Sequence, residues 1–250
     1  MKVAMMQPSF LPWQGYFELI RRSDVFVLLD DFQFSAQSYH QRNRMFVGPD
    51  RVDWYTVPVA KAGQFALPLN QVRIDDRTGW RRKTSARWKH VYGRAPYFQA
   101  LYPELERWLS TPAASLAELN IGFIKLVLGA IGWERELRRS SDFESGGARS
   151  WRVVDILRSC GATEYFCARG SFDYMAEDGL FPVSGITVKF QNFAPKPYTQ
   201  QPVATDFKPF LSVLDAMFFI GPEETGRLIE QGTDRWLAWS DIALVERNVT

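Results

Sequence analysis

The chain contains little cysteine, only Cys160 and Cys167 in 250 residues, and these two form neither a CxxC pattern nor a metal-site spacing. This excludes a disulfide scaffold and a cysteine-ligated zinc site, and it favours a reducing compartment. Long apolar runs are also missing, because the longest, residues 121–133, is interrupted by Lys125 and three glycines. The first residues lead into a strand with Pro8 close behind, which does not fit a signal peptide. We therefore expect a cytoplasmic protein without a transmembrane segment.

A large net charge is absent as well. The 30 basic and 28 acidic residues give a formal charge of +2, so the overall charge does not indicate a nucleic-acid partner, and no DNA binding is expected. Aromatic residues, in contrast, make up 15% of the chain and include nine tryptophans. Such a content favours aromatic-walled clefts in addition to an aromatic core.

The beginning of the chain carries the strongest pattern. Residues 3–34 are predicted to form a strand, a tight proline-containing loop, a helix and a second strand at Val25–Leu29. Gln7 and Pro8 follow the first strand, and Asp30 and Asp31 follow the second. Because ligands of parallel α/β units bind outside the carboxyl ends of the strands, these residues locate a candidate site.

Alternating strand and helix patterns continue along the rest of the chain. They predict an α/β fold with a mostly parallel central sheet and helices on both faces, Rossmann-like or HUP-like, as one domain over residues 1–250 with a C-terminal helical tail. An irregular insertion is expected around residues 32–80, with strands near 45–47, 53–59 and 67–74. Further elements are expected at 78–94 (helix), 115–133 (helix), 136–140 (strand), 151–160 (helix), 164–167 (strand), 171–175 (helical turn), 186–190 (strand) and 211–219 (helix, ended by Gly221).

Several polar residues are candidates for chemistry. Asp30 and Asp31 could bind a cation, accept a proton or hold a ribose hydroxyl, or one of them could cap a turn. In the segment 39–44, His40 suits a general acid or base, Asn43 can donate to an oxyanion, and Arg44 can pair with a phosphate or carboxylate. The alternative for this segment is a solvated loop.

Other features have both a functional and a structural interpretation. The amides that open the helix after residue 13 could bind an anion, or Trp13 and Tyr16 could simply fill the core. Cys167 could be a nucleophile or an inert core residue. The basic run in residues 81–94 is typical of a solvated helix face, or it could dock a phosphorylated carrier, a nucleotide-linked substrate or RNA. Tyr198 and Gln200 follow a stiff proline-containing loop and suggest a binding lip.

Several sequence blocks follow one another in a characteristic order along the chain. The blocks are MQPSFLPWQGYFELI, DVFVLLDDFQF, QRNR, APYFQALYPELE, ARSWRVVDILRSCGATEYFCARGSFDYM, GITVKFQNF, PYTQ and LSVLDAMFFIG. In this order they resemble the WbqC-like family of bacterial surface-polysaccharide proteins. The resemblance implies a glycine (aminoacyl) transferase that modifies O-antigen or related sugars. Where family members commonly have Ser-Gly, this chain has Cys167-Ala168. The matching motif positions are Gln7, Pro8, Gly15, Tyr16, Asp30, Asp31, Gln41, Asn43, Arg44, Tyr198, Gln200 and Asp215.

A more distant similarity joins the first 45 or so residues to the adenylate-forming nucleotidyltransferase and pantothenate-synthetase group. Those enzymes carry an H-x-G-H motif where this chain has Trp13-Gln14-Gly15-Tyr16, so both histidines are missing. A shared architecture would imply a retained pocket with changed chemistry, or an ATP-dependent, adenylate-forming ligase.

Our leading hypothesis is an acyl or aminoacyl (glycine) transferase that acts on a sugar amine or hydroxyl. Asp30, Asp31 or His40 would be the base, Gln7 and Asn43 the oxyanion donors, and Arg44 the clamp for a phosphate or carboxylate. The acyl donor is a carrier-protein thioester, an aminoacyl-tRNA or an acid activated by ATP, and acyl carrier protein is a candidate partner.

The alternatives to the transferase are the ligase and a non-catalytic module that binds a nucleotide sugar or an acyl carrier. No metal site is expected. The substrate-binding candidates are Gln7, Trp13, Tyr16, Gln41, Arg44, Tyr198 and Gln200.

Overall fold

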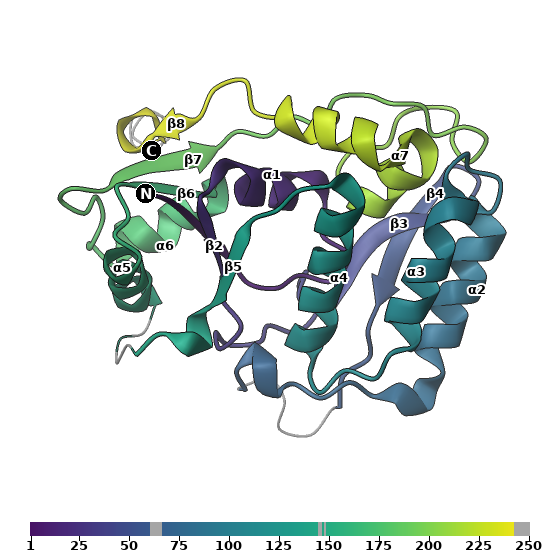
Figure 1. Cartoon of the computed structure of the whole chain (residues 1–250), viewed down its shortest axis with the longest axis horizontal. Helices are drawn as coiled ribbons and strands as arrows, with labels where there is room; N and C mark the ends of the chain where they lie inside the picture. Colours follow the sequence, from purple (N-terminus) through teal and green to yellow (C-terminus); the bar gives the residue numbers. More distant parts are fainter. Residues whose placement is uncertain (61–66, 145–146, 148, 243–250) are drawn as a thin grey trace.

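A six-stranded sheet in the order β5-β2-β1-β6-β7-β8 organises the protein (Figure 1). The computed structural model describes residues 1–60, 67–144, 147 and 149–242. The first five strands of this order run parallel, and β8 pairs antiparallel to β7 at one edge. The strands are β1 (Lys2–Met6), β2 (Val25–Leu28), β5 (Glu136–Arg139), β6 (Glu164–Ala168), β7 (Thr187–Gln191) and β8 (Leu237–Ala238).

Both faces of the central strands are buried. Val3 and Val25, which pair in register, point to one apolar cluster, whereas Ala4 and Phe26 point to another. Alternate residues of a strand face opposite sides of the sheet. A continuous apolar run is therefore the sequence signature of a strand that is buried on both faces. This explains why the short runs in residues 3–6 and 25–29 predicted buried strands correctly.

Helices cover both faces of the sheet and confirm the predicted fold class. On one face lies α1 (Gln14–Arg22), with α4 (Leu116–Ile131) and α7 (Val213–Glu230) packed around it. The other face is covered by α5 (Arg149–Ser159) and α6 (Phe172–Glu177). The helices α2 (Trp80–Tyr92) and α3 (Phe98–Ser110) extend the first layer away from the sheet (Figure 1).

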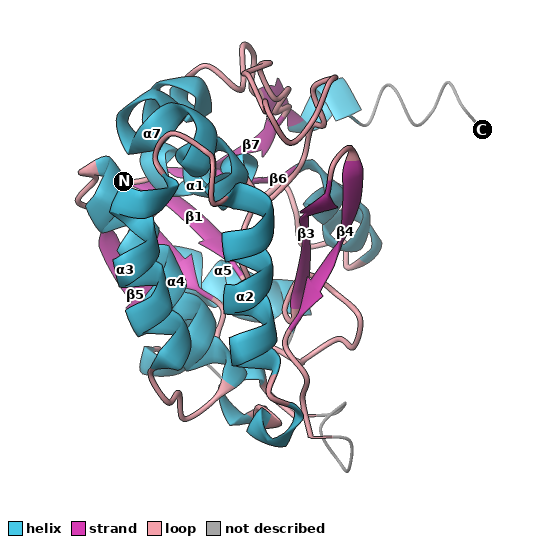
Figure 2. Ribbon diagram, turned by 90° about the vertical axis from the view of Figure 1, so that its right-hand side faces the viewer, coloured by secondary structure: helices cyan, strands magenta, loops and turns pink. Residues whose placement is uncertain are grey.

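The insertion around residues 32–80 contains a separate antiparallel hairpin, β3 (Arg42–Gly48) with β4 (Arg51–Thr56), which lies beside α2 (Figure 2). The strand expected at residues 67–74 is wrong. Pro68 has no N–H, and the next two amides donate to the loop after β2: Leu69 to the carbonyl of Phe32 and Asn70 to that of Asp30. The segment forms the short 3-10 turns Leu69–Gln71 and Asp76–Thr78 instead.

One helix is not among the elements expected from the sequence: α3 contains Pro103 within its length. The helix end expected at Gly221 is confirmed: with φ 82° and ψ 165° this residue ends one helical segment of α7, and Pro222 begins the next, which runs to Glu230. The expected C-terminal tail falls partly on residues 243–250, outside the described residues. Throughout the described ranges, no helix is long and apolar enough to cross a membrane.

Candidate functional site

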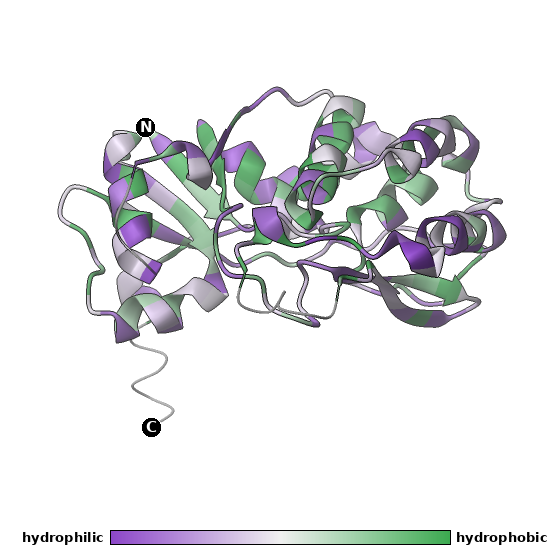
Figure 3. Cartoon of the chain, turned by 90° about the horizontal axis from the view of Figure 1, so that it is seen from below, coloured by the Kyte–Doolittle hydropathy of each residue, from purple (hydrophilic) through white to green (hydrophobic). Residues whose placement is uncertain are grey.

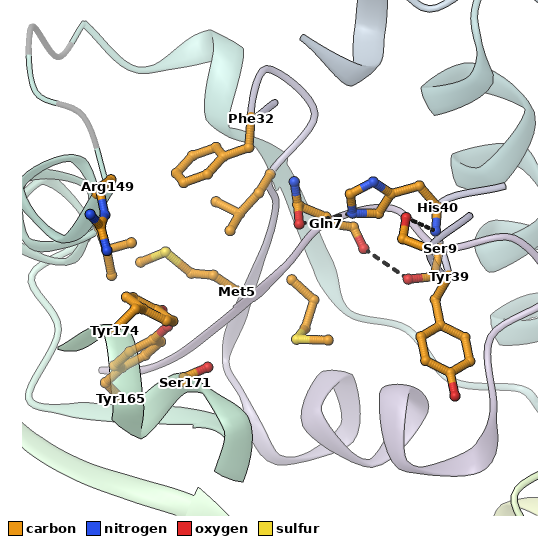
Figure 4. A pocket seen from close by; sticks show the side chains of 14 residues that line it. Met5, Gln7, Ser9, Phe32, Tyr39, His40, Arg149, Tyr165, Ser171 and Tyr174 are labelled. Carbon is orange, nitrogen blue, oxygen red and sulfur yellow. Dashed lines mark hydrogen bonds between the residues drawn. The ribbon is translucent and has the colours of Figure 1, made fainter. Parts of the chain in front are cut away.

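A cavity of about 420 Å³ lies at the carboxyl edge of the parallel sheet, the edge that the sequence indicated (Figure 4). Its floor comes from Met5 and Met6 at the end of β1, and Leu29 follows β2. The remaining lining residues come from the loop after β2, the segment around His40, the start of α5 and the region after β6. They include Phe32, Tyr39, Val153, Ser171 and Tyr174. Most of the wall is therefore apolar or aromatic.

One hydrogen-bonded chain forms the polar side of this cavity. His40 Nδ1 accepts from the backbone N–H of Ser35 at 3.2 Å, so its Nε2 carries the proton and donates to Gln7 Oε1 at 2.9 Å. Gln7 Nε2 in turn donates to the carbonyl of Gln33 at 3.1 Å. The Gln7 side chain lies between the His40 ring and the apolar wall with Met5 and Phe32 (Figure 4). The chain fixes the orientation of the Gln7 amide.

The imidazole of His40 is neutral in this setting. Burial lowers its pKa to about 4, because the charged form loses its hydration. Both ring nitrogens already have partners. At neutral pH, His40 is thus a fixed hydrogen-bond donor to Gln7, and its ring has no free nitrogen that could take a proton from a substrate.

Asp30 and Asp31 join secondary-structure elements next to the cavity and are not among its lining residues. Asp30 accepts from Ser141 Oγ at 2.9 Å and from the Ser141 N–H at 3.1 Å. Asp31 pairs with Arg152 of α5 and accepts from Ser140 Oγ. The two carboxylates thereby fix the end of β2 to β5 and α5. Over the described part of the chain, no cluster of His, Cys, Asp and Glu is arranged to hold a metal ion.

The side chains of the polar segment 39–44 do not share one site. Asn43 is buried, donates to the carbonyl of Leu11 at 2.8 Å and accepts from the Arg44 N–H at 2.8 Å. Its amide supports Leu11, which has a left-handed φ of 46°. Gln41 accepts from the Gln37 N–H, and Arg44 is exposed on β3. Only Tyr39 and His40 of this segment line the cavity.

The loop before α1 does not present an open anion site. A Cβ on Gly15 would lie 2.3 Å from the Trp13 indole, so this ring covers the first turn of the helix. Trp13 also packs against Phe193 and Phe210. Tyr16 is buried, and its hydroxyl donates to the carbonyl of Gln7 at 3.3 Å. This hydrogen bond holds the backbone of Gln7 in place.

Tyr198 and Gln200 belong to a different cluster, centred on the fully buried Asp215 of α7. The Asp215 carboxyl accepts from Tyr198 at 2.7 Å, from Gln200 at 2.7 Å and from Tyr92 at 2.9 Å. Burial raises the pKa of Asp215 to about 6, although these three donors oppose the shift. This cluster connects α2, α7 and the loop at residues 198–208, and its residues do not line the cavity.

Cys167 is a core residue on β6. It is fully buried, its Sγ lies 3.9 Å from the carbonyl oxygen of Lys189, and burial raises the pKa of the thiol well above its usual value. Because the thiolate is the reactive form, this cysteine is chemically inert where it lies.

Asn120 is a positioning residue that was not predicted from the sequence. It is fully buried in α4, and its Nδ2 donates to the carbonyl of Pro8 at 2.9 Å and to that of His40 at 2.8 Å. One side chain thereby joins the loops that carry Gln7 and His40. The available signal was a single amide in the apolar face of the helix in residues 115–133.

We predict that Asn120→Leu destabilises the protein by about 2–5 kcal/mol, because two buried carbonyl groups lose their donor at nearly constant side-chain size. Denaturant unfolding measures this change. Gly129→Ala on the same helix is the control: its Cβ would meet nothing within 4 Å, so stability should stay constant or rise by up to about 1 kcal/mol. An Asn120→Leu protein as stable as wild type would contradict the role of Asn120.

The Asp215 cluster predicts a specific pH dependence. Between about pH 4 and pH 6, the folded protein keeps a proton that the unfolded chain has released at its ordinary pKa of 3.8. The free energy of unfolding should thus decrease by about 3 kcal/mol as the pH rises through this window. Unfolding of wild type and Asp215→Asn as a function of pH measures the contribution as the difference between the two proteins.

Asp178→Asn is the control, because the contribution of Asp178 to the free energy of unfolding should change with pH in the opposite direction. Interaction with Ser150, whose N–H donates to the carboxylate, lowers the pKa of Asp178, so its stabilisation is present at high pH and disappears as the pH falls. A constant difference between wild type and Asp215→Asn across the window would rule out the proposed titration.

The comparisons with known proteins agree with the resemblance noted in the sequence. A model of the WbqC-like protein family matches residues 7–227. A protein of Mycobacterium tuberculosis named "Uncharacterized protein Rv1507c" is 28% identical over 226 residues, which cover 89% of this chain and 95% of that protein. No solved structure matches the chain. Since the family model spans far more than half of the sequence, the chain belongs to the WbqC-like protein family.

Proposed function

We propose that this protein is an acyl or aminoacyl transferase, which moves a small activated acyl group to an amine or hydroxyl acceptor such as a sugar. The observation that carries the proposal is the fixed Gln7 amide at the wall of the cavity. An amide nitrogen carries two hydrogens, and within the described residues only the Gln33 carbonyl accepts one of them. The second hydrogen is available to the carbonyl oxygen of a bound acyl group.

The surroundings of Gln7 suit this role. Met5, Leu29 and Phe32 give the cavity an apolar wall, which would hold a small acyl group and exclude water. A hydrogen bond in such a low-dielectric site is stronger than one in water. The His40 N–H that donates to Gln7 Oε1 polarises the amide, so its own N–H becomes a better donor. Negative charge that develops on the acyl oxygen would be stabilised without any reorganisation of the site.

The reaction is balanced without an enzyme-bound intermediate. The acceptor nitrogen or oxygen forms a bond to the acyl carbon, the bond from that carbon to the donor sulfur or oxygen breaks, and the acceptor proton passes to the leaving sulfur or oxygen. This route does not use Cys167 as a nucleophile, in agreement with its burial. It assigns His40 the role of a positioning residue for Gln7, and it places Asp30, Asp31 and Asn43 in the supporting structure.

The charge of the cavity favours acyl transfer over the adenylate-forming ligase. Among the described residues that line it, Arg149 is the only cation, and this guanidinium pairs with Glu177 at 3.0 Å and Asp178 at 3.4 Å. A nucleotide triphosphate would need several donors or cations for its phosphates. A neutral acyl group needs no cation, and one donor such as the Gln7 amide serves its carbonyl oxygen.

Gln7→Ala should lower kcat by about 10²–10³-fold, the usual effect of losing one oxyanion donor, and should change KM much less. Mass spectrometry of the acceptor after incubation with defined donors measures the transfer. His40→Phe should lower kcat as well, because it frees the Gln7 amide to rotate. Full activity in both variants would remove Gln7 from the mechanism, and binding without turnover in wild type would favour the non-catalytic module.

Cys167→Ala should keep kcat within about twofold of wild type, because the thiol is buried and protonated. Intact-protein mass spectra in the presence of donor should show no adduct on wild type. An acylated Cys167 peptide, or loss of turnover in a Cys167→Ala protein that retains its fold, would restore the covalent route.

A further inference from the structure

An aromatic and basic surface starts at the mouth of the cavity and continues over the outer face of the hairpin. Tyr39 lines the cavity, is 54% exposed and lies 5.9 Å from the Trp54 ring of β4. The guanidinium of Arg42 lies over the same indole at 4.2 Å. We call Tyr39, Arg42, Arg44 and Trp54 the hairpin surface. The cavity and this surface therefore share one residue, Tyr39.

The β3–β4 register places these side chains on one face. Arg44 pairs with Trp54 and Arg42 with Thr56, and directly paired residues of antiparallel strands project to the same side. Asp53 pairs with Met45 and so projects to the opposite side. The carboxylate of Asp50, at the tip of the hairpin, is occupied by Thr205. The outer face thus carries cations without a compensating carboxylate.

The arginines of this face have unused binding capacity. Within the described residues, neither Arg42 nor Arg44 forms an ion pair, and the buried Nε of Arg42 has no hydrogen-bond partner. A buried polar atom without a partner is costly unless a ligand supplies one. Arg44 is exposed and can reach a ligand directly.

The neighbouring helix α2 adds positive charge. It contains no acidic residue from Trp80 to Tyr92, and the Arg87 guanidinium lies 5.1 Å from the centre of the Tyr55 ring of β4. Lys83 lies one turn before Arg87 and is also exposed. The outer helices at the right of Figure 1 carry much hydrophilic colour in Figure 3. Such a concentration of one sign attracts polyanions to the hairpin even though the whole chain is nearly neutral.

We propose that the hairpin surface binds the single-stranded 3′ end of an RNA that carries the acyl group, as an aminoacyl-tRNA does. This rests on the proposed function and names its donor. Bases stack on aromatic rings and on guanidinium planes, and arginines contact the phosphates between them. With terminal bases on Trp54 and Tyr39, the acylated ribose at the 3′ end would enter the cavity next to Gln7.

A carrier protein fits this surface less well. Its prosthetic arm has one phosphate and a flexible thiol-ended chain. Neither group requires two aromatic rings that alternate with a guanidinium. The hairpin surface, in contrast, alternates the two kinds of contact that single-stranded nucleic acid requires, stacking and phosphate neutralisation. For this reason we assign the donor to RNA.

The test is fluorescence anisotropy of a labelled, uncharged tRNA acceptor stem with a single-stranded NCCA end of four nucleotides. Wild type should bind it, and removal of the four-nucleotide overhang should weaken binding. Trp54→Ala should weaken binding by about 10- to 100-fold, and Trp54→Phe should restore most of it because a ring remains for stacking. Arg44→Gln should weaken binding and reduce the slope of log K against log salt by about 0.7.

Trp151→Ala is the matched control, because this indole is 59% exposed on α5, at the opposite end of the molecule from the hairpin in Figure 1. Its RNA affinity should equal that of wild type. Circular dichroism confirms that each variant is folded. No binding by wild type at 50 mM salt, equal binding by Trp54→Ala, or binding of an acyl carrier protein in place of the RNA would overturn the proposal.

Gln7→Ala separates this inference from the proposed function. The amide lies in the cavity and not on the hairpin surface, so the variant should bind the acceptor stem as wild type does. RNA binding that depends on Trp54, together with no acyl transfer by wild type, would retain the docking surface and reject the transferase. Acyl transfer from a carrier thioester, with no RNA binding, would do the reverse.

Discussion

Burial of both faces of β1 and β2 is the constraint on which the rest of the structure depends. Since α1 covers one face and α5 the other, no polar side chain can function on the strands themselves. Polar groups must lie where the strands end, and the carboxyl ends of parallel strands form one edge. The loops after β1 and β2 meet there, which brings Gln7 close to Phe32 and opens a cavity between them.

The polar residues around this edge divide into two groups by their partners. Asp30, Asp31, Asn43 and Asn120 all have hydrogen-bond or ion-pair partners within the protein, and they hold loops and strand ends in place. Gln7 is held by two such contacts, but its second amide hydrogen has no acceptor within the described residues. A buried polar group that binds other parts of the chain supports the fold, whereas one that keeps a free donor in a cavity can serve a ligand.

Charge follows a different pattern inside and outside. The cavity is nearly neutral: the His40 imidazole is uncharged, and Arg149 is paired with carboxylates. Outside, the hairpin carries Arg42 and Arg44, which form no ion pair within the described residues, and α2 adds basic side chains without an acidic one. Such a division suits a substrate with a neutral reacting group at the end of a charged carrier, because the field outside attracts the carrier while the apolar site strengthens a single hydrogen bond to the reacting atom.

The sequence by itself determined the α/β class, the buried strands at residues 3–6 and 25–29, and the edge where the cavity lies, because these depend on local apolar periodicity and on strand polarity. It also indicated the family through the order of its motifs. Only the tertiary structure decided which polar residues share a site. Tyr198 and Gln200 bind Asp215 rather than the cavity, Asn43 supports Leu11, and Asn120 joins two loops more than 30 residues apart in sequence. Hydrogen bonds between distant segments leave no periodic pattern in a sequence, so a polar residue that reacts and one that supports the fold look alike until their partners are known.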